Sequence, residues 1–367
     1  MTYRVGVIGH TDRGNYGHGL DHVWLEMPET EIVAVADAHE TGRAKTMTQL
    51  DVSSGFADYR KMLDEARPDI VSICPRWLDQ HRDMVVAAAE RGIHIYMEKP
   101  LCRTLAEADE MVAHCEARNV KLAIAFQTRY SPTLSVIRNM IEEGQIGKLL
   151  ELRGRGKEDR RGGGEDLWVL GSHIMNLMHF LGGETNWCSA TVLENGRPIT
   201  SDEVQPGAEG IGPLAGDQLN AMYGMDDGVN GYFGSHRETS AGGLSRFGLQ
   251  IFGSRGVIEL TTGYVPQAQF LSDPSWSPGR SGKTWVQITS AGVGQPEPLA
   301  GQNNETGNVV ACRDLIAAIE EDRQPEANIY EARQSVEMIA AVFESHRVGG
   351  APVTFPLATR ENPLTLL

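Results

Sequence analysis

Short apolar runs alternate with helix-like stretches through the first third of the chain. The runs have the length and composition of strands that are buried on both faces of a sheet. They cover Tyr3–Gly9, Glu31–Asp37, Asp69–Pro75, Ile93–Pro100 and Lys121–Gln127. The intervening stretches carry helix signals, such as Thr104 placed three residues before Glu107 as in a capping box. Repeated strand–helix units predict a doubly wound parallel sheet, an α/β fold in which ligands bind beyond the carboxyl ends of the strands.

A glycine-rich turn follows the first of these runs. Gly9 and Gly14 have the spacing of the first and last glycines in the dinucleotide fingerprint G-x-G-x-x-G, whereas Thr11 stands where the middle glycine would be. We expect Gly9, Thr11 and Gly14 to form a turn that binds the cofactor phosphates, with the Thr11 hydroxyl contributing. A helix that includes Asp21–Met27 should come next. The turn alone would also suit a strand–turn–helix that binds nothing, but the five runs around it favour a cofactor.

The second run ends in Asp37, whose carboxylate can accept a hydrogen bond from the 2′-hydroxyl of an adenosine ribose. No arginine is adjacent to Asp37, and a carboxylate repels the 2′-phosphate of NADP, so the sequence predicts NAD and makes NADP the less favoured cofactor. Asp37 lies 28 residues after Gly9, a longer interval than usual. An enlarged loop through Asn15–Gly19 would absorb the excess and would carry Tyr16 and His18 toward the mouth of the active site.

The remainder of the chain has a different pattern. An amphipathic helix over roughly 132–143 precedes a strand at "LLELRGRG" and a largely apolar helix at "LWVLGSHIMNLMHFLGG". Short alternating runs dominate from Cys188 to Ile288, and two pairs of them indicate hairpins with turns at "DDG" and "GSRG". Late helices are expected around Val309–Glu321 and Ala332–Arg347. We therefore expect a nucleotide-binding domain at 1–126 and, at 127–367, an α+β domain with a large, mostly antiparallel open sheet.

Length and charge limit the classes of partner. The 367 residues are enough for two domains. A formal net charge of -16 argues against nucleic acid and anionic membranes as partners. The five cysteines are scattered without metal-type pairing, which suits a reducing compartment and a cytoplasmic location. The chain reaches its first apolar run by Val5, so we expect no secretory leader, and it has no apolar run long enough to span a membrane.

Several motifs occur together in a recognisable order. "EKPL" (Glu98–Leu101) follows the fourth run, "AFQTRYSP" (Ala125–Pro132) crosses into the second domain, and "GSHIMNLMHFLGG" contains His173. "LQIFGSRGVIEL" and the C-terminal "EARQSVEMIAAVFESHRVGGAPVTFP" come later. Together these motifs resemble the Gfo/Idh/MocA oxidoreductases over nearly the whole chain. The resemblance implies a Rossmann domain for NAD(P), a substrate domain built on an open sheet, a sugar or cyclitol substrate, and homodimers or homotetramers formed through that sheet.

Lys99 and His173 are the candidate catalytic residues. Oxidation of a secondary alcohol needs a hydride acceptor, a base for the hydroxyl proton and a positive charge near the developing alkoxide. Lys99 lies past the end of a strand, where its ammonium can polarise the hydroxyl. Glu98 is expected to orient Lys99 or to contact the cofactor ribose. The resemblance assigns proton transfer to His173, for which the alternative is an ordinary core histidine on an apolar helix.

Further candidates come from the resemblance or from neighbouring positions. Pro75 and His81 match positions near the cofactor in the family. The substrate candidates are Arg129 and Tyr130 at the domain crossing, Asp166 and Trp168 before the histidine, and Asn176 one helical turn after it. Trp168 could stack on a sugar, although a buried aromatic fits the sequence equally well. His173 and His179 do not have metal-ligand spacing, so we expect no metal.

Two carboxylates of the family pattern are missing. Members commonly place an aspartate four residues before the histidine and another three residues after it, where this chain has Val169 and Asn176. Asp166 lies seven residues before His173. On one helix that separation is roughly 10 Å, too far for a direct hydrogen bond. We therefore expect Lys99 and His173 to carry proton transfer without the usual carboxylate, and Asp166 to bind a sugar hydroxyl.

The sequence supports one main hypothesis and two alternatives. The main hypothesis is an NAD-dependent dehydrogenase that transfers a hydride between the nicotinamide and a secondary hydroxyl of a sugar, glycoside or cyclitol. The first alternative is a glycoside hydrolase or lyase that keeps its NAD bound and uses it in a transient oxidation, elimination and reduction cycle. The second is a non-catalytic nucleotide-binding member of the family, which the missing carboxylates would suit. Net formation of NADH distinguishes the dehydrogenase from both.

Overall fold

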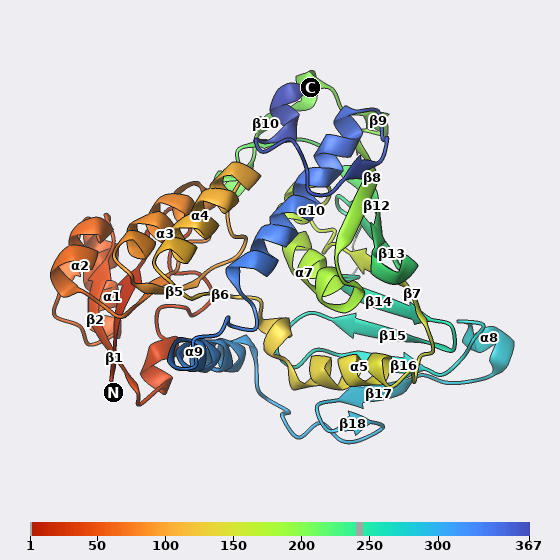
Figure 1. The fold of residues 1–367 in the computed structure, drawn as a ribbon, viewed down its shortest axis with the longest axis horizontal. Helices are drawn as coiled ribbons and strands as arrows, with labels where there is room; N and C mark the ends of the chain where they lie inside the picture. Colours follow the sequence, from red (N-terminus) through yellow and green to blue (C-terminus); the bar gives the residue numbers. More distant parts are fainter. Residues whose placement is uncertain (1, 240–244) are drawn as a thin grey trace. The chain divides into compact units, whose positions relative to one another are not determined.

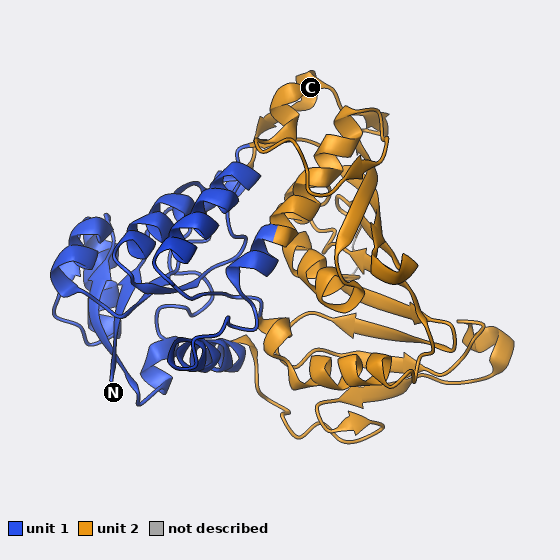
Figure 2. Ribbon diagram, viewed as in Figure 1, with its two compact units in different colours: residues 1–126, 208–212, 305–333 blue, residues 127–207, 213–304, 334–367 orange. Residues whose placement is uncertain are grey.

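The computed structural model describes residues 2–239 and 245–367, which fall into two compact units (Figure 2). The first unit contains residues 1–126, 208–212 and 305–333. The second contains residues 127–207, 213–304 and 334–367. The first unit therefore takes in two later stretches of chain besides the N-terminal 126 residues.

The sheet of the first unit has six strands, and every neighbouring pair is parallel. In spatial order they are β3 (Gly55–Phe56), β2 (Thr30–Ala36), β1 (Tyr3–Ile8), β4 (Ile70–Ile73), β5 (His94–Met97) and β6 (Leu122–Ile124). The strand order reverses at β1, which lies between β2 and β4. In doubly wound sheets this reversal is the point at which ligands bind.

Helices connect these strands (Figure 1). The connecting helices are α1 (Glu40–Gln49), α2 (Tyr59–Ala66), α3 (His81–Glu90) and α4 (Leu105–Ala117). A further helix, α9 (Asn304–Glu320), comes later in the chain and connects none of these strands. Side chains satisfy amides at three of these helix starts. Nδ1 of His39 accepts from the amide of Gly42 at the start of α1. Asp58 accepts from the amide of Arg60 ahead of α2, and Thr104 accepts from the amide of Glu107 ahead of α4. The predicted cap at Thr104 is therefore present.

The helix expected over Asp21–Met27 does not form as an α-helix. Its place is taken by a single 3-10 turn, η1 (Val23–Glu26). The residues with positive φ in the preceding loop are Asp12, Gly14, Asn15, Gly17 and Gly19. A left-handed backbone cannot continue a right-handed helix, and Pro28 disfavours helical backbone at Met27 from the other side. The glycine-rich stretch therefore forms a long folded loop where the dinucleotide fingerprint predicts a helix start.

The second unit is built on a large, mostly antiparallel sheet of eleven strands. In spatial order they are β18 (Gly292–Val293), β17 (Val286–Thr289), β16 (Ala268–Leu271), β15 (Gly256–Thr261), β14 (Gly248–Gly253), β7 (Leu149–Arg155), β13 (Asn230–His236), β12 (Gln218–Met225), β8 (Thr185–Glu194) and β19 (Val353–Thr354), with β9 (Arg197–Pro198) also paired to β8. The pair β7–β13 is parallel, and the other pairs are antiparallel. Both predicted hairpins, β12–β13 and β14–β15, are present.

Helices lie along one side of this sheet (Figure 1). They are α5 (Pro132–Glu142), α6 (Gly164–Val169), α7 (Gly171–Gly182) and α10 (Ile329–Arg347), and a short helix α8 (Pro278–Ser281) follows β16. The sequence predicted one helix over "LWVLGSHIMNLMHFLGG", but Leu170 (φ -115°, ψ -37°) is the C-cap of α6 and the N-cap of α7 and so divides it into two helices. A Cβ at Gly154 of β7 would meet Ile174 of α7, so Gly154 faces the helices. Arg153 and Arg155 alternate with it and point to the other face.

The remaining elements are short. They are the two-stranded sheet of β10 (Gln205–Pro206) and β11 (Pro213–Leu214), and the 3-10 turns η2 (Leu78–Gln80), η3 (Gln127–Tyr130), η4 (Ser201–Glu203), η5 (Ala208–Gly210), η6 (Asp226–Gly228) and η7 (Pro363–Leu366). Within the described residues, no helix has both the length and the apolar character needed to cross a membrane. The predicted fold class, a doubly wound parallel sheet followed by an α+β unit on a mostly antiparallel sheet, is confirmed.

Candidate active site

Asp37 is the centre of a hydrogen-bond cluster where β2 ends. Its carboxylate is buried, and Oδ2 accepts from the amide of Thr11 (3.0 Å), the hydroxyl of Thr11 (2.6 Å) and the hydroxyl of Tyr16 (2.9 Å). Oδ1 accepts from the amide of His39 at 2.9 Å. The Thr11 hydroxyl therefore donates a hydrogen bond to Asp37 and does not point to a phosphate site, which is where the fingerprint predicts it.

The loop between Gly9 and Gly14 satisfies most of its own amides. The amides of Arg13 and Asn15 donate to the carbonyl of His10, whose own amide donates back to the carbonyl of Asn15. Gly14 needs to be glycine here, since its φ is +90° and a Cβ would lie 2.6 Å from the amide nitrogens of Arg76 and Trp77. In this form the loop packs against the segment after β4.

A cavity of about 220 Å³ opens where β1 and β2 end. Its wall includes Gly9 from the first loop, Asp37 and Ala38 after β2, and Tyr59 at the start of α2. The cavity combines a buried carboxylate with an aromatic side chain, at the position where doubly wound sheets bind nucleotides. The residues present therefore fit the adenosine part of NAD.

His81 lies at the start of α3 and is fully buried. Its Nε2 lies 2.7 Å from the carbonyl oxygen of Pro75, and its Nδ1 lies 3.0 Å from that of Pro100. The imidazole thus joins the segment after β4 to the segment after β5. The sequence predicts Pro75 and His81 near the cofactor. In the structure, the two contacts of His81 hold the segments after β4 and β5 together.

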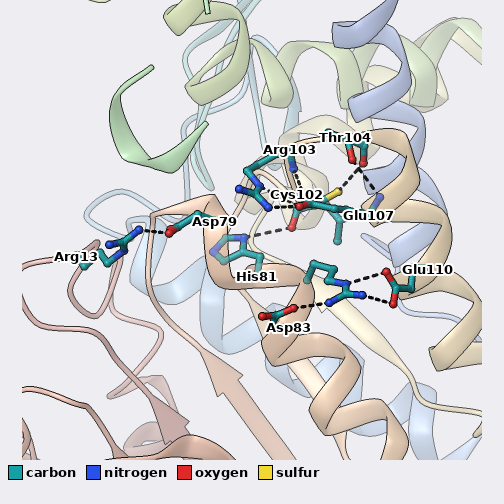
Figure 3. Close-up of polar contacts among 11 residues, drawn as sticks. Arg13, Asp79, His81, Asp83, Cys102, Arg103, Thr104, Glu107 and Glu110 are labelled. Carbon is teal, nitrogen blue, oxygen red and sulfur yellow. Dashed lines mark hydrogen bonds and ion pairs between the residues drawn. The ribbon is translucent and has the colours of Figure 1, made fainter. Parts of the chain in front are cut away.

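Ion pairs surround this buried imidazole (Figure 3). Arg13 pairs with Asp79 and lies over the ring of Trp77, so the glycine-rich loop is held to η2. Nε of Arg103 donates to Glu107 at 2.9 Å, within the capped start of α4. Such pairs are partly exposed, and we treat them as positioning contacts of modest energy.

Glu98 follows β5 and is fully buried. Its Oε1 accepts from the amide of His18 at 3.0 Å and lies 2.5 Å from Nδ1 of the same residue, and its Oε2 accepts from the amide of Lys99 at 3.1 Å. Burial raises the pKa of the Glu98 carboxyl, but the hydrogen bond from His18 and the charge of Lys99 outweigh burial and set that pKa below its usual value. Glu98 is therefore an ionised carboxylate whose visible partners are His18 and the backbone.

The carbonyl of His18 is held by a residue from late in the chain. Nδ2 of Asn308, on α9, donates to the carbonyl oxygen of His18 at 2.9 Å, and Oδ1 of Asn308 accepts from the hydroxyl of Tyr96 in β5 at 2.8 Å. Asn308 is fully buried. Sequence reasoning did not single out Asn308, because 290 positions separate it from His18 and no local pattern marks it.

Lys99 comes directly after Glu98, beyond the carboxyl end of β5, and is largely buried. The predicted position of Lys99 at a strand end is therefore present. A lysine buried beside an ionised carboxylate can hold a positive charge close to a reacting oxygen.

The second unit carries the remaining candidates on η3, α6 and α7. His173 lies in the first turn of α7, and its ring contacts Phe247 edge to face at 6.2 Å between centroids. Asn176 follows one turn later and is buried. The guanidinium of Arg129 lies 3.6 Å from the ring centroid of Phe180, farther along α7. These contacts bring Arg129 close to the helix that carries the histidine, as a stacked cation.

Asp166 has a different environment from the one that the sequence analysis expected. Its carboxylate is fully buried, and Oδ2 accepts from the hydroxyl of Ser235 (2.6 Å) and the amide of Glu158 (3.0 Å), while Oδ1 accepts from the amide of Lys157 (3.1 Å). These bonds tie α6 to β13 and to the loop after β7. The carboxylate is thus engaged inside the unit, and we no longer assign it to a sugar hydroxyl.

Two other residues that the sequence predicts as substrate contacts, Trp168 and Tyr130, are also buried. Trp168 is 2% exposed, which suits the core aromatic that the sequence left open as the alternative to a sugar platform. Tyr130 is buried in η3. Among residues 2–239 and 245–367, no group of three or more His, Cys, Asp or Glu side chains could hold a metal ion.

The sequence of the chain is similar to a known protein family and to named proteins. Residues 3–126 match the model of GFO_IDH_MocA, an oxidoreductase family with an NAD-binding Rossmann fold. Over 93% of its length the chain is 24% identical to levoglucosan dehydrogenase of Pseudarthrobacter phenanthrenivorans, of which it covers 95%. It is 27% identical to glycosyl hydrolase family 109 protein 1 of Akkermansia muciniphila over 44% of this chain and 36% of that protein.

A solved structure shares the fold of both units. Levoglucosan dehydrogenase in complex with NADH and levoglucosan aligns with a TM-score of 0.76 and 22% identity, over 97% of this chain and 100% of that one. The fold likeness therefore extends well beyond the 124 residues of the family match.

Proposed function

The chain belongs to the Gfo/Idh/MocA oxidoreductases, and we propose that it transfers a hydride between NAD and a secondary hydroxyl of a sugar, glycoside or cyclitol. The observation that carries the proposal is Lys99, a buried cation beside an ionised carboxylate at the carboxyl end of β5. The full-length similarity to a relative named levoglucosan dehydrogenase supports a sugar-derived alcohol as the substrate.

We assign the following tasks to residues of the chain. The cavity beside Gly9 and Asp37 binds the adenosine part of NAD. Lys99 polarises the substrate hydroxyl and stabilises the alkoxide that develops as the proton leaves. His173 takes part in proton transfer, and its neighbour on α7, Asn176, contacts a substrate hydroxyl. The oxidised nicotinamide, when bound, supplies the hydride acceptor.

We also propose that residues 1–126 form the cofactor domain and residues 127–367 the substrate and oligomerisation domain. Arg129 and Tyr130, at the start of the second domain, are proposed substrate contacts. The sheet face that carries Arg153 is proposed as the contact between copies in a homodimer or homotetramer. Light scattering of the purified protein tests this assignment, and a monomer at working concentration would contradict it.

A second candidate activity has a specific support. The chain is 27% identical over 44% of its length to a protein named as a glycosyl hydrolase. In this second activity NAD stays bound to the protein, and the transient oxidation of the sugar allows its glycosidic bond to be eliminated.

One experiment separates these activities. The protein is incubated with NAD and a panel of sugars, glycosides and cyclitols, while NADH absorbance and glycoside cleavage are followed in parallel. Net NADH supports the dehydrogenase, and cleavage without NADH supports the second candidate. In either case, alanine at Lys99 or His173 should lower turnover far more than it weakens NAD binding. Near-normal turnover of His173→Ala on the true substrate would remove His173 from the site.

A further inference from the structure

We propose that His18, held by Glu98, is a proton-transfer residue of this reaction. The inference rests on the proposed function and deepens it, because it adds a residue that comes from the enlarged glycine-rich loop. In the oxidation direction, the hydroxyl proton that the substrate releases with the participation of His173 is accepted by Nε2 of His18, and the hydride leaves the carbon with its electron pair for oxidised nicotinamide. The products are a ketone, NADH and an imidazolium that returns its proton to water.

The geometry of the pair is that of a carboxylate orienting an imidazole. Nδ1 of His18 lies 2.5 Å from Oε1 of Glu98, and the amide of His18 donates to the same oxygen. Because Glu98 is ionised, Nδ1 carries the hydrogen, and the lone pair is then on Nε2. The Glu98 side chain is 1% exposed and that of His18 is 52% exposed, so the pair has one buried and one open end. A general base needs such an exposed end to exchange a proton with substrate and water.

The loop is shaped to bring His18 onto Glu98. Gly17 has a φ of +65°, and a Cβ there would lie 2.6 Å from both Oε1 of Glu98 and the carbonyl oxygen of Cys74. A side chain at Gly17 would therefore push His18 away from the carboxylate. From the other side, Asn308 holds the His18 carbonyl. Glu98 and Asn308, from two distant parts of the chain, therefore hold this one residue.

The position of the pair connects it to Lys99. Glu98 accepts from the backbone amide of Lys99 through Oε2 and from His18 through Oε1, so one carboxylate contacts both residues. Other charged or titratable groups nearby are Glu305 on α9 and, on the loop itself, the pair His22–Asp21. Glu98 itself is a positioning residue, because it acts through His18.

The test is His18→Asn. An asparagine Nδ2 occupies the place of the histidine Nδ1 and can still donate to Glu98, but it has no basic nitrogen. We expect kcat to fall by about a hundredfold or more, with the KM for the polyol and the affinity for NADH largely retained. Free imidazole should restore part of the kcat of His18→Ala. If His18→Asn keeps the wild-type kcat, the bond to Glu98 is merely structural and the inference is wrong.

His22→Asn is the matched control. His22 lies four residues later, has a similar side-chain exposure of 48%, and also lies beside a carboxylate, Asp21, at 3.1 Å. The same substitution at His22 should leave kcat unchanged. An equal loss in both variants would indicate a general effect on the loop and would overturn the assignment to His18.

A second measurement does not depend on turnover. Diethyl pyrocarbonate modifies exposed, unprotonated imidazole nitrogens, and peptide mass spectrometry locates the modified residues. We expect His18 to be modified in the free protein and protected by NADH, whereas His22 is modified in both states. Modification of His18 at the same rate with and without NADH would contradict the inference. A wild-type protein that reduces no NAD on any polyol would instead remove the proposed function, and the role of His18 with it.

Discussion

The hydroxyl of Tyr16 lies 2.9 Å from Oδ2 of Asp37, so the enlarged loop closes over the acidic residue that ends β2. The Tyr16 ring also fills the space beside Gly9, where a Cβ would lie 2.1 Å from a ring carbon. One aromatic side chain thus fixes the turn after β1 and the carboxylate after β2. Burial is the main cause that raises the pKa of the Tyr16 hydroxyl, which therefore remains a hydrogen-bond donor.

Gly9→Ala should destabilise the protein and weaken NAD binding, because the new methyl group displaces the Tyr16 ring. Overpacking of this kind costs about 1–3 kcal/mol. In a Tyr16→Ala background the same substitution should cost much less, and urea unfolding of the four proteins measures that coupling. Gly279→Ala serves as the control, since its nearest neighbour would be 3.9 Å away. Equal losses in both backgrounds would show that Tyr16 is not the cause.

The buried carboxylate of Asp37 should also make the protein prefer NAD. A 2′-phosphate placed near Asp37 is repelled, and a penalty of about 1.4 kcal/mol corresponds to tenfold weaker NADP binding. Asp37→Asn should narrow the ratio of the two dissociation constants measured by calorimetry. Arg43 donates to the Asp37 carbonyl at 2.6 Å and is the cation that would oppose this preference, so Arg43→Ala should weaken NADP binding further. Comparable or tighter NADP binding by the wild type would contradict the prediction.

Local sequence patterns were enough to predict five of the six strands of the parallel sheet and most helices, whereas the two-residue edge strand β3 was not predicted. The apolar residues of β1, β4, β5 and β6 are buried, as is the second half of β2 from Ala34, and the capping signal at Thr104 marks the start of α4. These features depend on neighbours within a few positions, which a sequence displays directly. The absence of an α-helix after β1 could not be predicted in this way, because the loop there is held by residues far away in the sequence, such as Asp37 and Glu98.

The candidate site was predictable only where a motif is contiguous. Glu98 and Lys99 are adjacent in sequence, and their place at the end of β5 was expected. The partner of Glu98 was not, because His18 lies 80 positions away. For Asp166 the local pattern was misleading, because an acidic residue next to a glycine-rich loop indicated a contact with a sugar hydroxyl of the substrate. The fold turned it inward onto Ser235, 69 positions later, and no local pattern signals that bond.

Asp166→Asn should therefore lower stability and leave the substrate KM almost unchanged. One carboxylate oxygen accepts from the amide of Lys157 and the other from the amide of Glu158. An asparagine NH2 must face one of these donors, and an unsatisfied buried group costs about 1–3 kcal/mol. Ser235→Ala should also lower stability, because it removes the hydroxyl that donates to Asp166 and leaves the amide of Gly163 without the acceptor that this hydroxyl provides. A raised KM with unchanged stability would return Asp166 to the substrate site.

The contribution of Glu98 to stability should depend on pH in a defined direction. The hydrogen bond from His18 and the charge of Lys99 overcome burial, so the Glu98 pKa in the folded state lies below the value of 4.5 expected in the unfolded chain. The folded state then binds fewer protons than the unfolded state between these two pKa values, and stability rises with pH across that window. The stabilisation is fully present above about pH 4.5 and is lost as the pH falls through the folded-state pKa.

Urea unfolding of the wild type and of Glu98→Gln over a pH series measures this contribution. The difference in the free energy of unfolding between the two proteins should be constant near neutral pH and should shrink below about pH 4.5. His18→Asn supplies the control, because its amide can still donate to Glu98 and should preserve most of the difference. A difference that grows as the pH falls would mean that burial dominates and that Glu98 is protonated in the folded protein. In that case the carboxylate could not orient the His18 imidazole.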